Sequence, residues 1–231
     1  MRPYVICHML QSINEKVTGD FLSKEEVNEG IEIYYKINRE LKKDAIALGR
    51  VTMEDSFTNK YYPSLEKYKG IKIKKEDYID SLHDFYMIAF DRYGRLGYKD
   101  NKIIDPDEGY NNAYIIEVLL EDTKEEYLAY LQELHISYIF AGKDELNISL
   151  ALEKLNKYFN IKNIILEGGS IINGAFIKED LVDEVSLVTV PVLAKDSDKP
   201  LFYGYEFNKL NFKLKEETIN EGIVIQRFIK E

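Results

Sequence analysis

Short apolar runs alternate with helical stripes along most of this chain, and this alternation constrains the fold more than any other feature. Strands that alternate with helices predict an α/β protein whose sheet has a mostly parallel core. Residues 211–218 and 223–229, joined by a turn at 220–222, predict a closing antiparallel pair. The other runs that we predict as strands are residues 3–10, 44–48, 84–90, 113–120, 137–141, 163–166 and 182–193.

Capping patterns and helical spacing predict the helices between these strands. Ser23 with Glu26, and Thr123 with Glu126, have the spacing of a capping box at a helix start. Further helices are predicted around the stripe Ile148, Leu152, Leu155 and Phe159, and at 170–177. We find no repeat or long linker, so residues 1–231 are predicted as a single domain. Within it, the lysine-rich segment 57–83 reads as an insertion, more typical of a solvated loop than of a functional lid.

Charge and cysteine content exclude several classes of partner. Lys and Arg number 31 against 41 Asp and Glu, and the net charge of −10 disfavours nucleic acid and anionic membrane surfaces. Cys7 is the single cysteine, so no internal disulfide and no multi-cysteine zinc site can form. No window approaches the roughly 20 apolar residues of a membrane span. We therefore expect a cytoplasmic globular protein with no metal, membrane or nucleic-acid partner.

The sharpest local signal is the run LEGGSIINGAF at residues 166–176, in which a strand leads through two glycines into a helix. Adjacent glycines let a ligand approach the backbone, and the N–H groups of a helix start can hold a phosphate. A plain tight turn explains the pattern equally well. Two familiar nucleotide-binding motifs are absent. The chain has no G-x-G-x-x-G run, which excludes the Rossmann fingerprint. Ala175 follows Gly174 where the phosphate-binding loop of nucleotide hydrolases needs lysine, which excludes that loop.

Two other strand ends carry weaker versions of this signal. Gly49, Arg50 and Thr52 follow one predicted strand and could clamp an anion, although a surface arginine beside a helix cap is the commoner case. Ala141 and Gly142 lie at the end of another predicted strand. Because ligands of open α/β sheets bind at the carboxyl ends of strands, such separated turns suit an extended ligand such as a dinucleotide.

Taken together, these motifs resemble the RibD C-terminal family, the pyrimidine reductases of riboflavin biosynthesis, in a stand-alone form. The resemblance spans nearly the whole chain and implies a dihydrofolate-reductase-like three-layer fold. That fold has about eight or nine strands, a mostly parallel sheet with an antiparallel C-terminal pair, and helices on both faces. The runs that carry the resemblance are RPYV at 2–5, QS at 11–12, LGRVTME at 48–54, DRYGRL at 91–96, YIFAG at 138–142, LEGGSIINGAF at 166–176, DLVDEV at 180–185 and PVL at 191–193.

The resemblance implies NADPH as the cofactor. It places Gly49, Arg50 and Thr52 on the pyrophosphate side and Asp91 with Arg92 near the adenosine 2′-phosphate. It assigns the diphosphate and nicotinamide ribose to Gly168, Gly169, Ser170 and Ile171, with a cis peptide bond between the two glycines. Ala141 and Gly142 complete the implied cofactor contacts.

On the substrate side, the chain departs from the family pattern at the end of its first strand. His8 stands where the family usually has lysine, and Ser12-Ile13-Asn14-Glu15 replaces Ser-(Leu/Val)-Asp-Gly. The resemblance makes His8 and Glu167 candidate catalytic residues, with His8 as proton donor or substrate anchor. Ser12 and Asn14 are candidate substrate-binding residues. A lone strand histidine is otherwise more often structural.

The implied reaction reduces the ribosyl C1′ of a 5-amino-6-(5-phosphoribosylamino)uracil-like pyrimidine to a ribityl chain, in a homodimeric enzyme. One alternative is a dihydrofolate-type reductase acting on a pterin. Another is a non-catalytic NADPH-binding paralogue, which the departures at His8, Asn14 and Glu15 motivate.

Overall fold

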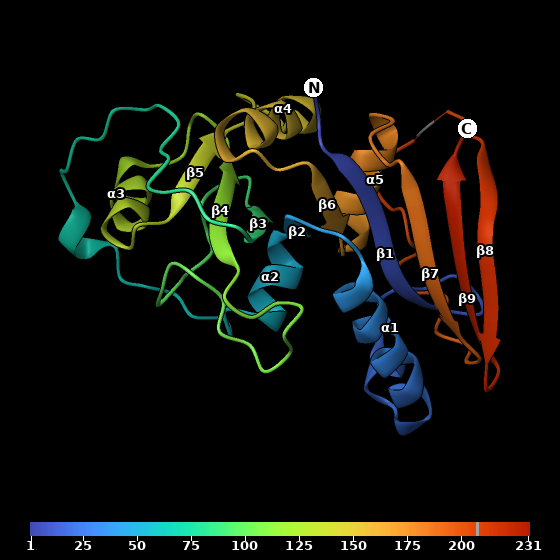
Figure 1. Ribbon diagram of the computed structural model, residues 1–231. Coiled ribbons are helices and arrows are strands. Elements are labelled where there is room, and N and C mark those ends of the chain that lie inside the picture. Colours follow the sequence, from blue (N-terminus) through green and yellow to red (C-terminus); the bar gives the residue numbers. More distant parts are fainter. Residues whose placement is uncertain (207) are drawn as a thin grey trace. The chain divides into compact units, whose positions relative to one another are not determined.

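A computed structural model describes residues 1–206 and 208–231 of the chain (Figure 1). The chain divides into two compact units. Unit 1 contains Met1–Pro3 and Lys43–Lys162, and unit 2 contains Tyr4–Lys42 and Asn163–Glu231. Unit 1 is therefore continuous apart from three N-terminal residues, whereas unit 2 is assembled from two distant stretches of sequence.

Unit 1 is built on four parallel strands in the spatial order β5-β4-β3-β2. Their side chains are almost all buried, which explains why the strands appear in the sequence as continuous apolar runs. Parallel pairing places all four carboxyl ends at one edge, with Gly49 level with Phe90. The strands are β2 (Ala45–Gly49), β3 (Tyr86–Phe90), β4 (Tyr114–Leu119) and β5 (Ser137–Phe140).

The helices of unit 1 are α2 (Arg50–Ser56), α3 (Glu125–Glu133) and α4 (Ile148–Phe159). The capping box predicted at Thr123 is wrong, because the residue that caps α3 is Lys124 and the Thr123 hydroxyl donates to the Leu120 carbonyl instead. All of the predicted insertion 57–83 is described, and it contains one short 3-10 turn, Glu66–Tyr68, and no other helix or strand. The single-domain organisation stays a prediction.

Unit 2 has five strands in the order β6-β1-β7-β9-β8. β6, β1 and β7 are parallel, whereas β9 pairs antiparallel with both β7 and β8. The antiparallel C-terminal pair is therefore confirmed, with its turn at Glu221 and Gly222. The strands are β1 (Tyr4–Ser12), β6 (Asn163–Leu166), β7 (Glu184–Val190), β8 (Phe212–Asn220) and β9 (Ile223–Lys230).

The helices of unit 2 are α1 (Asn28–Glu40) and α5 (Ser170–Lys178). The helix start predicted at Ser23 is wrong: two 3-10 turns, Asp20–Ser23 and Glu25–Val27, precede α1. Phe21 and Val27 are buried beside Leu10 and Val188 in a core that α1 covers, and these two anchors hold the entry segment in tight turns.

The described residues thus form a mixed α/β protein with nine strands, mostly parallel, which confirms the predicted fold class. Cys7 lies in β1 and is fully buried. Among the described residues, none of the helices combines the length and the apolar character that crossing a bilayer would require.

Candidate functional site

The turn between β6 and α5 has the backbone geometry that the glycine pair predicts. The peptide bond from Gly168 to Gly169 is cis, as the resemblance implies. Gly168 has a φ of +85°, and a Cβ there would lie 3.2 Å from the Met9 methyl carbon. Gly169 caps α5 with no side-chain hydrogen bond to the helix N-terminus. The turn therefore leaves the helix start without a polar side chain of its own to satisfy its N–H groups.

Two buried polar atoms near this helix start have no hydrogen-bond partner among the described residues. The Ser170 side chain is 2% exposed and the Asn173 side chain is 0% exposed, yet Ser170 Oγ and Asn173 Oδ1 are unpaired. An unpaired buried polar group is costly, so a hydroxyl in this position is suited to a bound ligand. Ile171 is 51% exposed and presents an apolar side chain beside them.

Glu167, the residue before the glycines, is held by α1. Its Oε1 accepts a hydrogen bond of 2.5 Å from Asn38 Nδ2, and both side chains are buried. Cys7 lies close enough that the Glu167 charge, together with burial as the larger cause, raises the pKa of the thiol. A carboxylate with one oxygen fixed in this way is a directional acceptor for N–H or O–H groups.

His8 lies on β1 directly opposite Ser186 of β7 and is fully buried. Its Nδ1 lies 3.0 Å from Ser186 Oγ, and its Nε2 lies 3.0 Å from the Tyr34 carbonyl oxygen. Since a carbonyl can only accept, Nε2 carries the proton and Nδ1 accepts from the serine hydroxyl. Both ring nitrogens are thus engaged, and the roles of proton donor or substrate anchor stay predictions.

Ser12 and Asn14 close the turn that follows β1. Ser12 Oγ donates to Asn14 Oδ1 at 2.8 Å and accepts from the Lys16 amide at 3.0 Å. Asn14 also exchanges two hydrogen bonds with the backbone of Ala194. These hydrogen bonds tie the end of β1 to the segment after β7. The substrate contacts of Ser12 and Asn14 stay predictions.

In unit 1, the Gly49–Thr52 segment is the junction of β2 and α2. Arg50 begins α2, and its guanidinium lies 2.7 Å from Glu54 Oε2, one helical turn on. Tyr62 donates to the other oxygen of Glu54 at 2.6 Å. Arg50 is 30% exposed, so it retains access to solvent at the carboxyl edge of the strands.

Asp91, the residue after β3, shapes the loop that follows. It is fully buried, and its Oδ2 accepts from the amides of Arg95 and Leu96, the latter at 2.7 Å. Burial is the main cause of the raised pKa of this carboxyl group. Arg92 donates to the Asp144 carbonyl and lies over the Tyr93 ring.

Ala141 and Gly142 follow β5. The Ala141 amide donates to Leu119 at 2.8 Å, which ties the segment to β4. Gly142 has a φ of +118°, and a Cβ there would lie 2.0 Å from the Glu145 carbonyl oxygen. The close approach of Glu145 therefore explains why residue 142 is a glycine. The cofactor contact of Ala141 and Gly142 stays a prediction.

β4 carries a buried acid that the sequence motifs did not predict as a site residue. Glu117 is fully buried and accepts from the hydroxyls of Tyr98 and Tyr127, the latter at 3.2 Å. Burial, followed by the charge of Asp91, raises the pKa of Glu117 well above its ordinary value. The available signal was a single acidic residue inside the otherwise apolar run 113–120. Asn38 of α1 was also not singled out, because the sequence does not reveal that this polar residue is buried.

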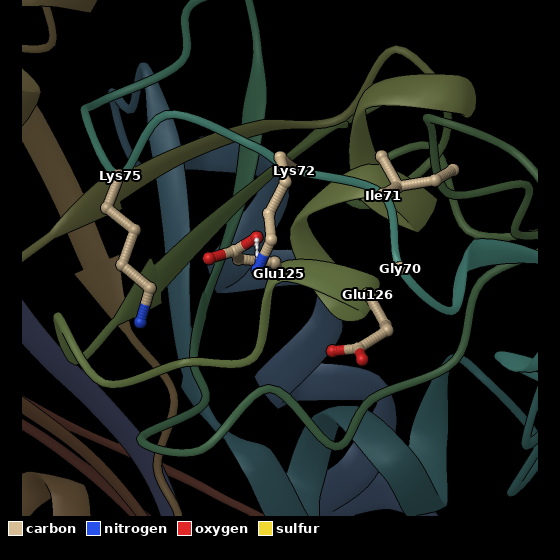
Figure 2. Close-up of a pocket in the computed structure, with 6 residues that line it drawn as sticks. All are labelled: Gly70, Ile71, Lys72, Lys75, Glu125 and Glu126. Carbon is tan, nitrogen blue, oxygen red and sulfur yellow. Dashed lines mark ion pairs between the residues drawn. The ribbon is translucent and has the colours of Figure 1, made fainter.

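A shallow pocket of about 220 Å³ lies on unit 1 beside the start of α3 (Figure 2). Lys72 points toward Glu125, with 3.5 Å between Nζ and Oε2, and Lys75 donates to the Glu121 carbonyl. The lysine-rich stretch of the insertion is therefore partly neutralised by groups of its own unit. The pocket holds none of the residues that the sequence predicted for the site.

Residues 3–225 match the sequence profile of the RibD C-terminal domain. A 2,5-diamino-6-ribosylamino-4(3H)-pyrimidinone 5′-phosphate reductase of Aquifex aeolicus (strain VF5) is 32% identical over 91 residues. That match covers 39% of this chain and 40% of the Aquifex protein.

Three solved structures share the fold at low sequence identity. RibD of Acinetobacter baumannii (form 1) is 19% identical with a TM-score of 0.65, and the match covers 100% of this chain and 58% of that one. A pyrimidine reductase-like protein of Corynebacterium diphtheriae is 14% identical with a TM-score of 0.66, over 99% and 92% of the two chains. The riboflavin biosynthesis reductase of Saccharomyces cerevisiae is 15% identical with a TM-score of 0.63, over 100% and 90%.

The chain therefore has the α/β fold of these structures, the dihydrofolate-reductase-like fold that the resemblance predicted. More narrowly, the chain belongs to the RibD C-terminal domain family, which confirms the resemblance inferred from its motifs. The chain spans a little over half of the Acinetobacter protein, 58% of its length.

Proposed function

We propose that this protein is an NADPH-dependent reductase of riboflavin biosynthesis. Its substrate would be a 5-amino-6-(5-phosphoribosylamino)uracil-like pyrimidine, reduced at the ribosyl C1′ to a ribityl chain. The observation that carries the proposal is the turn from Glu167 to Ser170, which sets a buried, unpaired hydroxyl beside an uncapped helix start. Family membership and the reductase from Aquifex support the reaction class.

The residues of this turn fit a dinucleotide phosphate. The N–H groups at the start of α5 would hold the phosphate oxygens, with the unpaired Ser170 hydroxyl as an additional donor. The exposed Ile171 side chain would pack against an apolar part of the cofactor. When bound, NADPH supplies the hydride. The cofactor contacts proposed for Gly49, Arg50, Thr52, Asp91, Arg92, Ala141 and Gly142 belong to unit 1 and rest on the resemblance.

On the substrate side, Glu167 is the residue that we assign to the ribosylamino group. Its carboxylate would accept from an N–H or hydroxyl of the substrate and would stabilise positive charge on an imine nitrogen. His8 stays the proposed proton donor or anchor, and for either role one ring nitrogen must release its present partner, the Tyr34 carbonyl oxygen or the Ser186 hydroxyl. Ser12 and Asn14 would border the pocket through the turn that they close.

We also propose a cytoplasmic homodimer. β8 is exposed along nearly its full length, and Leu214 and Ile219 are 46% and 70% exposed on it. A long, uncovered edge strand with apolar side chains can pair with a strand of another chain, and a second copy of this protein would cover it. The single buried thiol suits a reducing compartment.

The test uses the purified protein, NADPH and the pyrimidine substrate, with loss of reduced-nicotinamide absorbance as readout. We expect tight NADPH binding and oxidation that depends on the pyrimidine. Turnover with dihydrofolate in its place would favour the pterin alternative. Tight binding without turnover of either compound would favour a non-catalytic paralogue, which the internal hydrogen bonds of His8, Ser12 and Asn14 also suit. Failure to bind NADPH would overturn the central proposal.

A further inference from the structure

The face of α1 that meets the sheet of unit 2 is polar at two positions one helical turn apart. Tyr34 stacks on His8 and receives its Nε2 hydrogen bond through the backbone carbonyl. Asn38, four residues on, reaches Glu167 with its side-chain amide. Positions four apart in a helix lie on the same face. α1 therefore contacts both candidate catalytic residues, His8 and Glu167.

The burial of Asn38 is unusual for its residue type. It is 0% exposed, and among the residues of α1 only Gly30 is also classed as buried. Burying an amide costs free energy unless it is hydrogen-bonded, and apolar side chains would cover this face without that cost. The short contact with Glu167 therefore gives the asparagine a specific role.

Asn38 also constrains the chemistry of Glu167. The contact joins Asn38 Nδ2 to Glu167 Oε1 at 2.5 Å, and the amide can serve only as the donor at that atom. A donated hydrogen bond favours the ionised form of a carboxyl group. Because an amide does not titrate, its donation persists across the working pH range. Fixing one oxygen also fixes the plane in which the other can accept.

We propose that Asn38 is the positioning residue of Glu167. It orients the carboxylate toward the substrate and keeps it ionised, so that it accepts from ribosyl hydroxyl or amino groups. This inference rests on the proposed function, since it assigns a task to Asn38 through the substrate contact of Glu167.

The test compares Asn38→Asp and Asn38→Leu with the parent protein. Both variants keep about the same side-chain volume and remove the N–H donor. We expect kcat/KM for the pyrimidine to fall about tenfold to hundredfold, with the KM for NADPH unchanged. The acid limb of the pH–rate profile moves to higher pH, because Glu167 loses a bond that favours its ionised form.

The matched control is Asn156→Leu, which removes an asparagine amide that donates to the Ile161 carbonyl at 2.9 Å in α4. We expect Asn156→Leu to lower the free energy of unfolding and to leave the pH–rate profile unchanged. A merely structural Asn38 would behave like this control, and an unmoved acid limb in folded Asn38 variants overturns the proposal.

A direct titration separates this inference from the proposed function. The carboxyl carbon of Glu167, labelled with ¹³C and assigned by its loss in Glu167→Gln, reports protonation without substrate. We expect its midpoint to rise in Asn38→Leu, which removes the donor and adds no charge. This variant decides the test, because the new carboxyl group of Asn38→Asp would raise the midpoint by repulsion alone. If the parent protein shows no turnover, the proposed function fails while the titration still decides whether Asn38 controls Glu167. If the midpoint is unchanged and the parent protein turns over normally, the positioning role of Asn38 is rejected and the proposed function stands.

Discussion

The imidazole of His8 and the phenol of Tyr34 lie parallel, with ring centroids 4.4 Å apart and planes 5° from coplanar. Stacking and the hydrogen bond from Nε2 to the Tyr34 carbonyl oxygen fix β1 against α1, and the contact of Nδ1 with Ser186 ties His8 to β7.

His8→Gln replaces the ring and breaks this arrangement. We expect the free energy of unfolding to fall by about 2–4 kcal/mol, because a fully buried, doubly bonded side chain is lost. Urea denaturation measures this. Because His8 is the proposed proton donor or substrate anchor, we expect kcat/KM for the pyrimidine, measured on the folded variant, to fall about tenfold or more. A folded variant that keeps the parent value would instead leave His8 a structural residue.

Ser170→Ala removes a hydroxyl that is buried without a partner. We expect the NADPH dissociation constant to rise about fivefold to tenfold, with the melting temperature unchanged or slightly higher. Calorimetric titration and thermal unfolding check both. Ser137→Ala is the opposing control, because the Ser137 hydroxyl accepts from the Asp80 amide at 3.1 Å. Ser137→Ala should lower the melting temperature and leave the NADPH affinity unchanged. If Ser170→Ala does the same, the Ser170 hydroxyl does not contact NADPH.

Arg50→Met deletes the cation that we assign to the NADPH pyrophosphate. Its ion pair with Glu54 is partly exposed and spaced i,i+4, so the stability loss should be below about 0.5 kcal/mol. NADPH affinity should fall about tenfold, more steeply at low salt. Lys60→Met is the matched control, since Lys60 pairs with Asp55 at 3.0 Å on the same unit. Equal affinities in the two variants would contradict the assignment of Arg50.

Glu117→Gln should raise the free energy of unfolding, and this gain should grow as pH rises. The pKa of Glu117 is raised in the folded state, mainly by burial and then by Asp91. Its favourable contribution is therefore complete below the unfolded value of about 4.3 and is lost as pH rises above it. A glutamine cannot ionise and still accepts from the two tyrosines.

We expect a gain of about 1–3 kcal/mol near neutral pH, shrinking toward about pH 4, from urea midpoints. A constant difference across pH would show that ionisation of Glu117 is not the cause.

Cys7 should be chemically inert in the folded protein. Burial and the Glu167 charge raise the pKa of its thiol, so the thiolate is scarce and inaccessible. An aromatic disulfide reagent should react with one thiol equivalent in urea and with almost none in buffer. Rapid reaction in buffer would indicate that β1 opens readily.

The strands were predictable because parallel strands buried on both faces leave apolar runs, as at 44–48 and 84–90. α2 was not predicted, since Arg50–Ser56 has little apolar periodicity and Met53 is its one fully buried apolar anchor. The capping box at Thr123 misled because the hydroxyl prefers the Leu120 carbonyl, which a sequence pattern does not reveal.

The glycine turn of the site could be predicted because the residues that form it are adjacent in the sequence. Asn38 and Glu167 could not be paired from the sequence, because 129 positions separate them and only the packing of α1 on the sheet joins them. The engagement of both His8 nitrogens is likewise a product of distant partners, Tyr34 and Ser186.

The split of unit 2 has a consequence for synthesis on the ribosome. β1 is made before the other eight described strands, yet both strands that flank it, β6 and β7, are encoded after residue 162. The strands of unit 1, by contrast, pair in the order in which they emerge. Unit 1 can therefore fold on the nascent chain while the apolar β1 waits unpaired. That waiting strand is the segment that a chaperone would need to shield until β7 has left the exit tunnel.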